Sequence, residues 1–227
     1  KPITYYHDAS PMVQGLVAAR EKRGGPINVA VVGLGTGTLA CQMKPGDQLT
    51  YYEIDPTVVR IAKDPKRFTF LSECAPDAKI VIGDARLTLA AAPDGQYDIL
   101  IVDAFSSDAI PTHLLTREAM AIFKEKIKPD GMILMHISNK HMTLAPVVAG
   151  VADANDMVSR ANDSDEGYDD DNHIFGSMVV AVARRDEDFG ELAKKDGWVE
   201  QEPDEDEWVW TDDYSNVIGA ILKKLRE

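Results

Sequence analysis

Five short apolar segments, each long enough to form one strand, divide the first 140 residues of this 227-residue chain. Each is followed by a turn signal or by a stretch with helical character, and the segments are 27–32, 48–54, 79–82, 97–102 and 132–137. Continuous apolar runs of this length are typical of parallel strands buried on both faces, which helices must connect. The pattern therefore predicts an α/β fold with an open, doubly wound, mostly parallel sheet.

The connecting segments and the C-terminal third complete the predicted organisation. Helices are predicted at 38–43, 56–63, 85–92, 115–127, 144–151, 188–195 and 216–225, and a further strand at 174–183. Three parts are expected: an N-terminal strand and lead-in segment at 1–26, a main domain at 27–185, and an acidic extension at 186–227 packed on the same domain.

Acidic residues outnumber basic ones by 38 to 24, which gives a formal net charge of -14. The excess is local, because residues 1–152 carry 16 acidic and 16 basic side chains, whereas residues 153–213 carry 21 and 5. A net negative charge disfavours non-specific binding to nucleic acid and to anionic membranes, so we expect no nucleic-acid partner. Because the strand-rich part is neutral, specificity for a cationic ligand must come from a few placed carboxylates.

The two cysteines, Cys41 and Cys74, are too few for a disulfide framework and lack the spacing of metal ligands. We therefore predict that they are reduced and that the protein is cytoplasmic. No run approaches the roughly 18 apolar residues that a membrane span needs. The chain begins at Lys1 without an apolar leader, so we expect that upstream sequence is missing and leave open whether it included a membrane region.

A glycine-rich loop, Gly33-Leu34-Gly35-Thr36-Gly37, follows the first predicted strand directly. Glycines let the backbone turn tightly and approach a ligand, and the start of the next helix offers free N–H groups. The loop could also be a simple strand-to-helix turn. Glu53, 20 residues after Gly33, ends the second strand and is placed to accept hydrogen bonds from ribose hydroxyls. The alternative for Glu53 is a solvated carboxylate.

Two more carboxylates follow predicted strands, Asp84 after the third and Asp103 after the fourth. The carboxyl ends of parallel strands meet at one edge of a sheet, where open α/β folds bind ligands. Asp84 could instead cap the helix that follows it. Together with the glycine loop, these carboxylates indicate a nucleoside site at this edge.

The order of these motifs resembles the nucleoside-binding half of the spermidine synthase family, the polyamine aminopropyltransferases. The matching segments are G-L-G-T-G, Y-E-I-D-P, G-D-A and Y-D-I-L-I-V-D, which begin at Gly33, Tyr52, Gly83 and Tyr97. Segments 103–118 and 210–216 look closer still to bacterial spermidine-synthase-like domains that are often fused to a membrane region. The resemblance covers residues 3–220 and implies the Rossmann-like fold of class I S-adenosylmethionine-dependent methyltransferases, with seven strands.

The resemblance also implies roles for the matching residues. The nucleoside and its sulfur-bearing chain would contact the glycine loop, the ribose-holding carboxylate and the adenine-contacting residues, namely Gly33, Gly35, Thr36, Gly37, Glu53, Ile54, Asp84 and Ala85. Asp103 matches the family's catalytic aspartate, and Asp108 matches the second aspartate of its gate loop. A carboxylate suits this chemistry because an attacking ammonium must lose a proton.

Five residues are candidates for the amine side of the site: Tyr6, Gln14, His113, Asp212 and Asp213. Tyr6 belongs to the stretch 3–7, which resembles the segment before the first strand that helps line the family's amine site. The family's tyrosine-glutamine-glutamate run is absent there, and Gln14 is the nearest polar residue. The other candidates each have an ordinary alternative. Tyr6 could belong to an edge strand, His113 could be a solvated loop histidine, and Asp212 and Asp213 could form a charged turn. For His136 and His141, after the fifth strand, we expect core packing or surface exposure.

Thr36 departs from the family, which carries an aspartate in its G-G-G-D-G loop to hold the donor's amine. A hydroxyl cannot replace that charge. Decarboxylated S-adenosylmethionine is the expected donor, and intact S-adenosylmethionine and methylthioadenosine stay open as ligands.

The predicted function is transfer of an aminopropyl group from decarboxylated S-adenosylmethionine to a polyamine such as putrescine, with Asp103 as base and Asp108 holding the far amine. One alternative is a methyltransferase that uses intact S-adenosylmethionine. The other is a non-catalytic nucleoside- or polyamine-binding domain. We expect no metal, because the acidic run 169–171 lacks the pattern of a calcium loop, and we leave a homodimer open.

Overall fold

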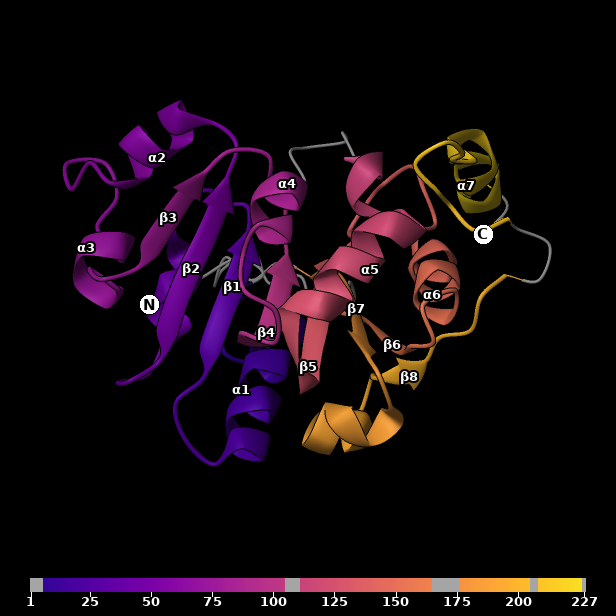
Figure 1. Cartoon of the computed structure of the whole chain (residues 1–227), viewed down its shortest axis with the longest axis horizontal. Coiled ribbons are helices and arrows are strands. Elements are labelled where there is room, and N and C mark those ends of the chain that lie inside the picture. Colours follow the sequence, from indigo (N-terminus) through magenta and orange to yellow (C-terminus); the bar gives the residue numbers. More distant parts are fainter. Residues whose placement is uncertain (1–5, 105–110, 165–175, 205–207, 226–227) are drawn as a thin grey trace.

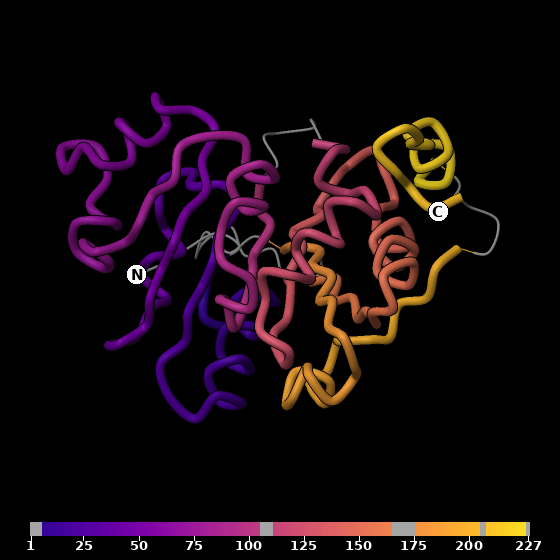
Figure 2. The backbone as a smooth tube through the Cα atoms, in the orientation of Figure 1, coloured from indigo at the N-terminus to yellow at the C-terminus, as the bar shows by residue number. Residues whose placement is uncertain are grey.

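An eight-stranded sheet runs through the molecule, with helices on both faces (Figure 1). This computed structural model describes residues 6–104, 111–164, 176–204 and 208–225. The strands are β1 (Asn28–Val32), β2 (Gln48–Glu53), β3 (Lys79–Ile82), β4 (Tyr97–Val102), β5 (Ile127–His136), β6 (Val158–Asp163), β7 (Met178–Ala183) and β8 (Val199–Glu200). Figure 2 shows the chain passing from β1–β3 at one end of the sheet to β6–β8 at the other.

The strand order is β3-β2-β1-β4-β5-β7-β6-β8, and the first five strands are parallel. The last three pair antiparallel to their neighbours. This confirms the predicted doubly wound, mostly parallel sheet. The expected number of seven strands is too low by one, because β8 adds a two-residue pairing at the edge, with Glu200 opposite Arg160. A strand of two residues has no periodicity to read from the sequence.

Alternate residues of each central strand belong to two separate cores. In β1, Val29 and Val31 pack with α1, η2 and η5, whereas Ala30 and Val32 pack with α5 and α6 on the other face. This burial of both faces is the reason for the continuous apolar runs. The helices are α1 (Pro11–Arg23), α2 (Pro56–Ala62), α3 (Phe70–Cys74), α4 (Ala85–Ala90), α5 (Arg117–Lys126), α6 (Ala145–Asp153) and α7 (Val217–Lys224), with 3₁₀ helices η2 (Thr38–Gln42), η3 (Thr112–Leu114) and η5 (Asp186–Lys194).

The N-terminal segment contains a helix that was not predicted, and most of the stretch expected as a short strand, residues 3–7, lies outside the described residues. Within residues 6–26 no strand is present, and α1 begins at a Ser10 cap whose hydroxyl accepts a hydrogen bond from the Val13 N–H. Pro11 lies in the first turn, and Gly24, with φ at 69°, ends the helix. These are standard start and stop signals for a helix.

Several other elements differ from the prediction in type or extent. The helix expected at 38–43 is the five-residue 3₁₀ helix η2, and the helix expected at 188–195 is η5, which is kinked at Gly190. Helix α3 and strand β6 were not predicted. The strand expected at 174–183 is β7, which begins at residue 178. Short elements of five or six residues carry too few periods to identify without their neighbours.

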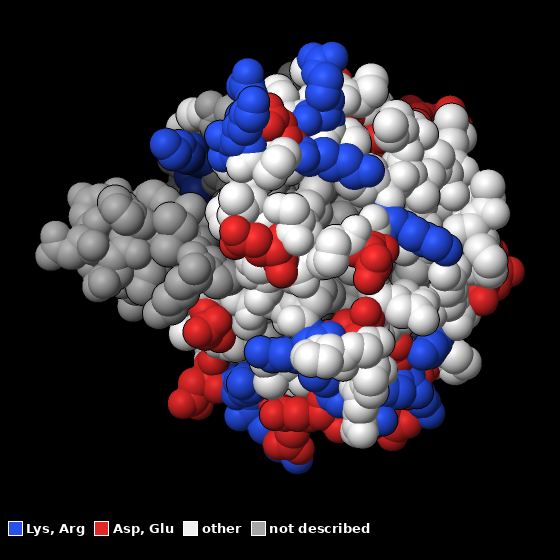
Figure 3. Space-filling view, turned by 90° about the vertical axis from the view of Figure 1, so that its left-hand side faces the viewer, with Lys and Arg blue, Asp and Glu red and all other residues white. Residues whose placement is uncertain are grey.

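Basic side chains gather along one end of the molecule, over α2 (Figure 3). The exposed cations of α2 and the turn after it are Arg60, Lys63, Lys66 and Arg67. The positive charge at this end opposes the approach of a cation from that side. Among the described helices, none has the length and apolar character that crossing a bilayer requires.

Candidate functional site

The switch in strand order places β1 between β2 and β4, and the ends of these three strands form the centre of the site. The Gly33 N–H donates to the carbonyl of Tyr52 at 2.9 Å, and the Asp103 N–H donates to the carbonyl of Val32 at 2.9 Å. The glycine loop therefore leaves the sheet between the residues that end β2 and β4. This is the arrangement predicted for Gly33, Glu53 and Asp103.

Two loop glycines differ in what surrounds them. Gly33 has φ at 96°, and a Cβ atom there would lie 2.2 Å from the carbonyl oxygen of Asp103. Gly35 has φ at 53°, and a Cβ atom there would have no neighbour within 4 Å. The close approach of backbone to backbone therefore requires glycine at position 33, whereas position 35 requires it only for its conformation.

We expect Gly33→Ala to lower the free energy of unfolding by about 2–3 kcal/mol, because a methyl group would displace the backbone of Asp103. Gly35→Ala is the matched control, with an expected loss of about 1 kcal/mol from its positive φ alone. Urea denaturation of both variants measures the difference. Equal losses would contradict the close packing of this loop against β4.

Glu53 ends β2, and only 8% of the residue is exposed. One carboxylate oxygen accepts the Leu34 N–H of the glycine loop and the other accepts the Asp55 N–H, both at 2.9 Å. Each oxygen keeps a second lone pair, so the group can still accept a hydroxyl. Ile54 follows on the rim and is 66% exposed, which leaves its side chain available to pack on a planar ring.

Asp84 caps α4, because its side chain accepts the Leu87 N–H at 3.1 Å. The capping alternative is therefore observed, and Ala85 is the first residue of that helix. The Nε2 atom of His113 lies 3.7 Å from the Asp84 carboxylate, and the His113 side chain is 51% exposed. The structure thus brings His113 to Asp84, beside the predicted adenine contacts.

Asp103 follows β4 directly and has an enclosed carboxylate, with the side chain 6% exposed. Oδ1 lies 2.8 Å from the Nδ1 atom of His136, and Oδ2 accepts a hydrogen bond from the hydroxyl of Tyr6. Burying a carboxylate without partners costs several kcal/mol, and these contacts offset that cost. Tyr6 thus contacts the predicted base itself.

His136 was not singled out from the sequence as a site residue. It ends β5, where Met135 pairs with Val102 of β4, so the next residues along the two parallel strands are His136 and Asp103. The alignment of these two strands could have identified the His136–Asp103 pair. To use it, one would have to know that β4 and β5 are neighbours and that a bulge near Tyr97 shifts their alignment.

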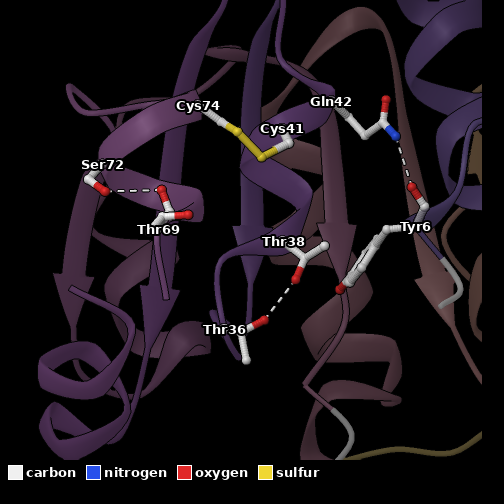
Figure 4. The surroundings of a disulfide bond; sticks show 8 residues. All are labelled: Tyr6, Thr36, Thr38, Cys41, Gln42, Thr69, Ser72 and Cys74. Atoms are coloured by element: carbon white, nitrogen blue, oxygen red, sulfur yellow. Dashed lines mark hydrogen bonds between the residues drawn. A yellow bond between two sulfur atoms is a disulfide. The ribbon is translucent and has the colours of Figure 1, made fainter. Parts of the chain in front are cut away.

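The two cysteines form a disulfide, so the prediction that they are reduced is wrong for this structure. Cys41 lies in η2 and Cys74 ends α3, and their Cα atoms are 4.8 Å apart although 33 residues separate them in sequence (Figure 4). The contact depends on α3, which was not predicted. The Nε2 atom of Gln42, next to Cys41, donates to the carbonyl of Tyr6 at 2.8 Å.

Two of the remaining amine-side candidates, Gln14 and Asp212, make hydrogen bonds to other parts of the chain. The side chain of Gln14 donates to the carbonyl of Ala9 at 2.9 Å and accepts the indole N–H of Trp198 at 2.8 Å. Asp212 accepts two hydrogen bonds from the guanidinium of Arg86 and one from Thr116, which connects the C-terminal tail to α4 and α5. Asp213 is exposed. Asp108 lies outside the described residues.

The Arg86 guanidinium holds the pKa of the Asp212 carboxyl below its ordinary value. A carboxyl with a lower pKa in the folded state stabilises the fold above the unfolded pKa, near 3.9, and loses that contribution as the pH falls through the folded pKa. Because the Asp212 side chain is 42% exposed, the contribution is modest.

We expect Asp212→Asn to lower the free energy of unfolding at pH 7 by about 0.5–1 kcal/mol, since an exposed ion pair contributes little more. The difference from the wild type should shrink as the pH falls below about 4, where the carboxyl of the unfolded chain becomes protonated first, and it should disappear below the lower pKa of the folded carboxyl. Asp213→Asn is the matched control and should match the wild type at both pH values in urea denaturation. An Asp212→Asn deficit as large at pH 3 as at pH 7 would contradict this assignment.

Two observations concern the described residues outside this edge of the sheet. Among them, no group of three His, Cys, Asp or Glu side chains is arranged to hold a metal ion. A cavity of about 670 Å³ opens at the opposite edge of the sheet, where Gln48 and Lys79 begin β2 and β3. None of the predicted site residues lines it.

Comparisons with known proteins identify the family and the fold that this chain resembles. A family model described as a spermine/spermidine synthase domain matches residues 9–157. A polyamine aminopropyltransferase from Vibrio vulnificus (strain CMCP6) is 30% identical over 114 residues, which cover 48% of this chain and 37% of that protein. The match therefore spans little more than a third of that relative's length.

Two solved structures share the fold at low sequence identity. A probable spermidine synthase from Corynebacterium glutamicum ATCC 13032 has a TM-score of 0.65 at 16% identity, covering 91% of this chain and 80% of that one. Human methyltransferase-like protein 13, in complex with SAH, has a TM-score of 0.54 at 18% identity, covering 95% of this chain and 90% of that one. The fold is therefore shared with methyltransferases.

Proposed function

The chain belongs to the spermine/spermidine synthase domain family, and on that premise we propose that it transfers an aminopropyl group from decarboxylated S-adenosylmethionine to a polyamine such as putrescine. The observation that carries the proposal is the enclosed carboxylate of Asp103, held between His136 and Tyr6 beside the glycine loop. The family match supports a transferase, and this carboxylate supports an amine as the acceptor.

The chemistry requires a base at this position. A polyamine nitrogen has a pKa near that of lysine, about 10.4, so exposing its lone pair at pH 7 costs about 4–5 kcal/mol. Asp103 binds the ammonium and accepts its proton as the nitrogen attacks. The donor supplies a methylene carbon bonded to a cationic sulfur. The N–C bond forms, the C–S bond breaks with its electron pair going to sulfur, and the proton is left on Asp103, with methylthioadenosine as the product.

In this proposal the nucleoside of the donor binds at the end of β2 and at the start of α4. Glu53 binds the ribose hydroxyls through the lone pairs that its two backbone hydrogen bonds leave. Ile54 packs on the adenine, and Asp84 with the backbone of Ala85 reads the adenine amino group. The exposure of Ile54 and the burial of Glu53 support these roles.

Fewer observed contacts support the proposed binding of the amine. Tyr6 borders the amine and holds Asp103, and Asp108 binds the far amine. His113, Asp213 and Gln14 stay predictions as substrate contacts. Asp212 is held by Arg86, which favours a structural role for it.

A second function, methyl transfer from intact S-adenosylmethionine, is favoured by one residue. The hydroxyl of Thr36 lies 2.7 Å from that of Thr38, at the loop position where the family's aspartate holds the donor's amine (Figure 4). The pair brings no negative charge, so it does not repel the carboxylate of an intact donor. A non-catalytic binding domain is the third candidate, since the same loss of charge suits a protein that no longer turns over its ligand.

Binding calorimetry followed by turnover tests distinguishes these functions. We expect tighter binding of decarboxylated than of intact S-adenosylmethionine, and formation of methylthioadenosine when putrescine is added. Preference for the intact donor would overturn the aminopropyltransferase proposal in favour of methyl transfer. Tight binding with no product from any amine and either donor would favour the binding domain.

The cytoplasm is the proposed location, and the disulfide counts against it, because disulfides are rare in reducing compartments. Alkylation of free thiols during cell lysis, followed by mass spectrometry, tests this directly. Alkylation of Cys41 and Cys74 would show that both thiols are free in the cell and would support a cytoplasmic location. An intact disulfide would point to an oxidising compartment. A homodimer and an upstream membrane region remain predictions.

A further inference from the structure

His136 is joined to the predicted base by the geometry of two neighbouring strands. Its Nδ1 atom lies 2.8 Å from Oδ1 of Asp103, and the side chains are 9% and 6% exposed. Both residues lie one position beyond the paired residues Val102 and Met135. Because rigid central strands hold both backbones, the contact does not depend on a loop conformation.

The chemistry of the carboxylate decides which atom carries the proton. An ionised carboxylate only accepts hydrogen bonds, so at 2.8 Å the Nδ1 atom of His136 must be the donor. The Tyr6 hydroxyl donates to the other oxygen, Oδ2. Among the described residues each oxygen has one donor, so rotation of the carboxylate about its axis would break both contacts, and each oxygen has a second lone pair with which to accept from an incoming ammonium.

We propose that His136 is a positioning residue, which donates through Nδ1 to Asp103 and so holds its carboxylate oriented toward the amine. This inference rests on the proposed function for its consequence in catalysis, whereas the hydrogen bond itself can be tested without turnover. His136 is buried and ends β5, where it pairs with Val179 of β7, and we assign it an effect on the amine through Asp103.

Two substitutions separate positioning from simple packing. His136→Leu removes the donor, and His136→Asn retains an N–H donor near the position of Nδ1. We expect His136→Leu to lower kcat by about 10- to 100-fold, since a small misplacement of a catalytic group costs this much, with KM for the donor nucleoside within about threefold. His136→Asn should recover most of kcat. His141→Leu, an exposed histidine after the same strand, is the control and should match the wild type.

Equal kcat losses in His136→Leu and His136→Asn, at equal stability, would overturn the proposal, because a retained donor would then have no effect. An unchanged kcat in a folded His136→Leu variant would do the same.

Nitrogen-15 NMR of the histidine rings tests the hydrogen bond independently of activity. We expect the His136 ring to carry its proton on Nδ1 in the wild type, and to lose that preference in Asp103→Ala but not in Asp84→Ala. A wild-type ring protonated on Nε2 alone would overturn the inference. If the wild type forms no product from any donor and amine while the NMR result holds, the proposed function fails and the His136–Asp103 contact stands.

Discussion

Asp103→Asn is expected to lower the rate of aminopropyl transfer by about 10²–10⁴-fold, the usual contribution of a general base. The variant keeps the shape of the side chain and an oxygen that can accept a hydrogen bond from His136. It removes the negative charge that binds the ammonium and the group that accepts its proton. The fold and the glycine loop should therefore be retained while the transfer step is lost.

Nucleoside binding in Asp103→Asn should stay within about tenfold of the wild type, because the proposed ribose and adenine contacts come from β2 and α4. Calorimetry with the donor measures this, and product formation from donor and putrescine measures turnover. Asp156→Asn removes the same charge from an exposed turn before β6, at a residue whose φ of 53° suits asparagine, and should leave both unchanged. Wild-type turnover in Asp103→Asn would exclude Asp103 as the base.

The parallel half of the sheet could be predicted because its strands are buried on both faces. That burial demands unbroken apolar runs, and β3 and β4 have the predicted bounds. The ends of these strands were equally readable, since Glu53, Asp84 and Asp103 each interrupt an apolar run with a carboxylate. The hydrogen-bond partners of these carboxylates could not be predicted, because they depend on how neighbouring strands are aligned with one another.

The partners of Asp103 show this limit most clearly. Tyr6 lies 97 positions away in sequence, and His136 lies 33 positions away. Contacts between residues so far apart in sequence leave no periodic pattern. The pairing of β4 with β5 brings His136 to Asp103, and the packing of the N-terminal segment against the sheet brings Tyr6 there. Asp212 shows the converse, because its acidic character suggested an amine contact while Arg86, 126 positions away, engages it.

Removing the disulfide is expected to destabilise the fold by about 3–4 kcal/mol, the chain-entropy contribution of closing a loop of this length. Cys41 and Cys74 are separated by 33 residues that include all of β2, α2 and most of α3. In the double variant Cys41→Ser/Cys74→Ser, the unfolded chain regains the freedom that the bond removes. Because a mesophilic domain has only about 5–15 kcal/mol of stability, the loss is large.

The same substitution should also weaken nucleoside binding, because the disulfide supports two parts of the site. A Cβ atom at Gly37 would lie 2.9 Å from the side chain of Leu71 in α3, so α3 packs directly under the glycine loop. Gln42 in η2 holds the backbone of Tyr6, whose hydroxyl contacts Asp103. Loosening η2 from α3 therefore affects the donor side and the base together.

Urea denaturation of the oxidised wild type, the reduced wild type and Cys41→Ser/Cys74→Ser measures the loss, and calorimetry with the donor measures binding. The reduced wild type and the double variant should agree, because both lack the covalent link while only one lacks the sulfur atoms. A reductant that leaves the midpoint of the wild type unchanged would show that the bond does not constrain the unfolded chain in solution. If the double variant is destabilised but binds the donor as tightly as the wild type, the disulfide stabilises the fold without supporting the nucleoside site, and α3 has a structural role only.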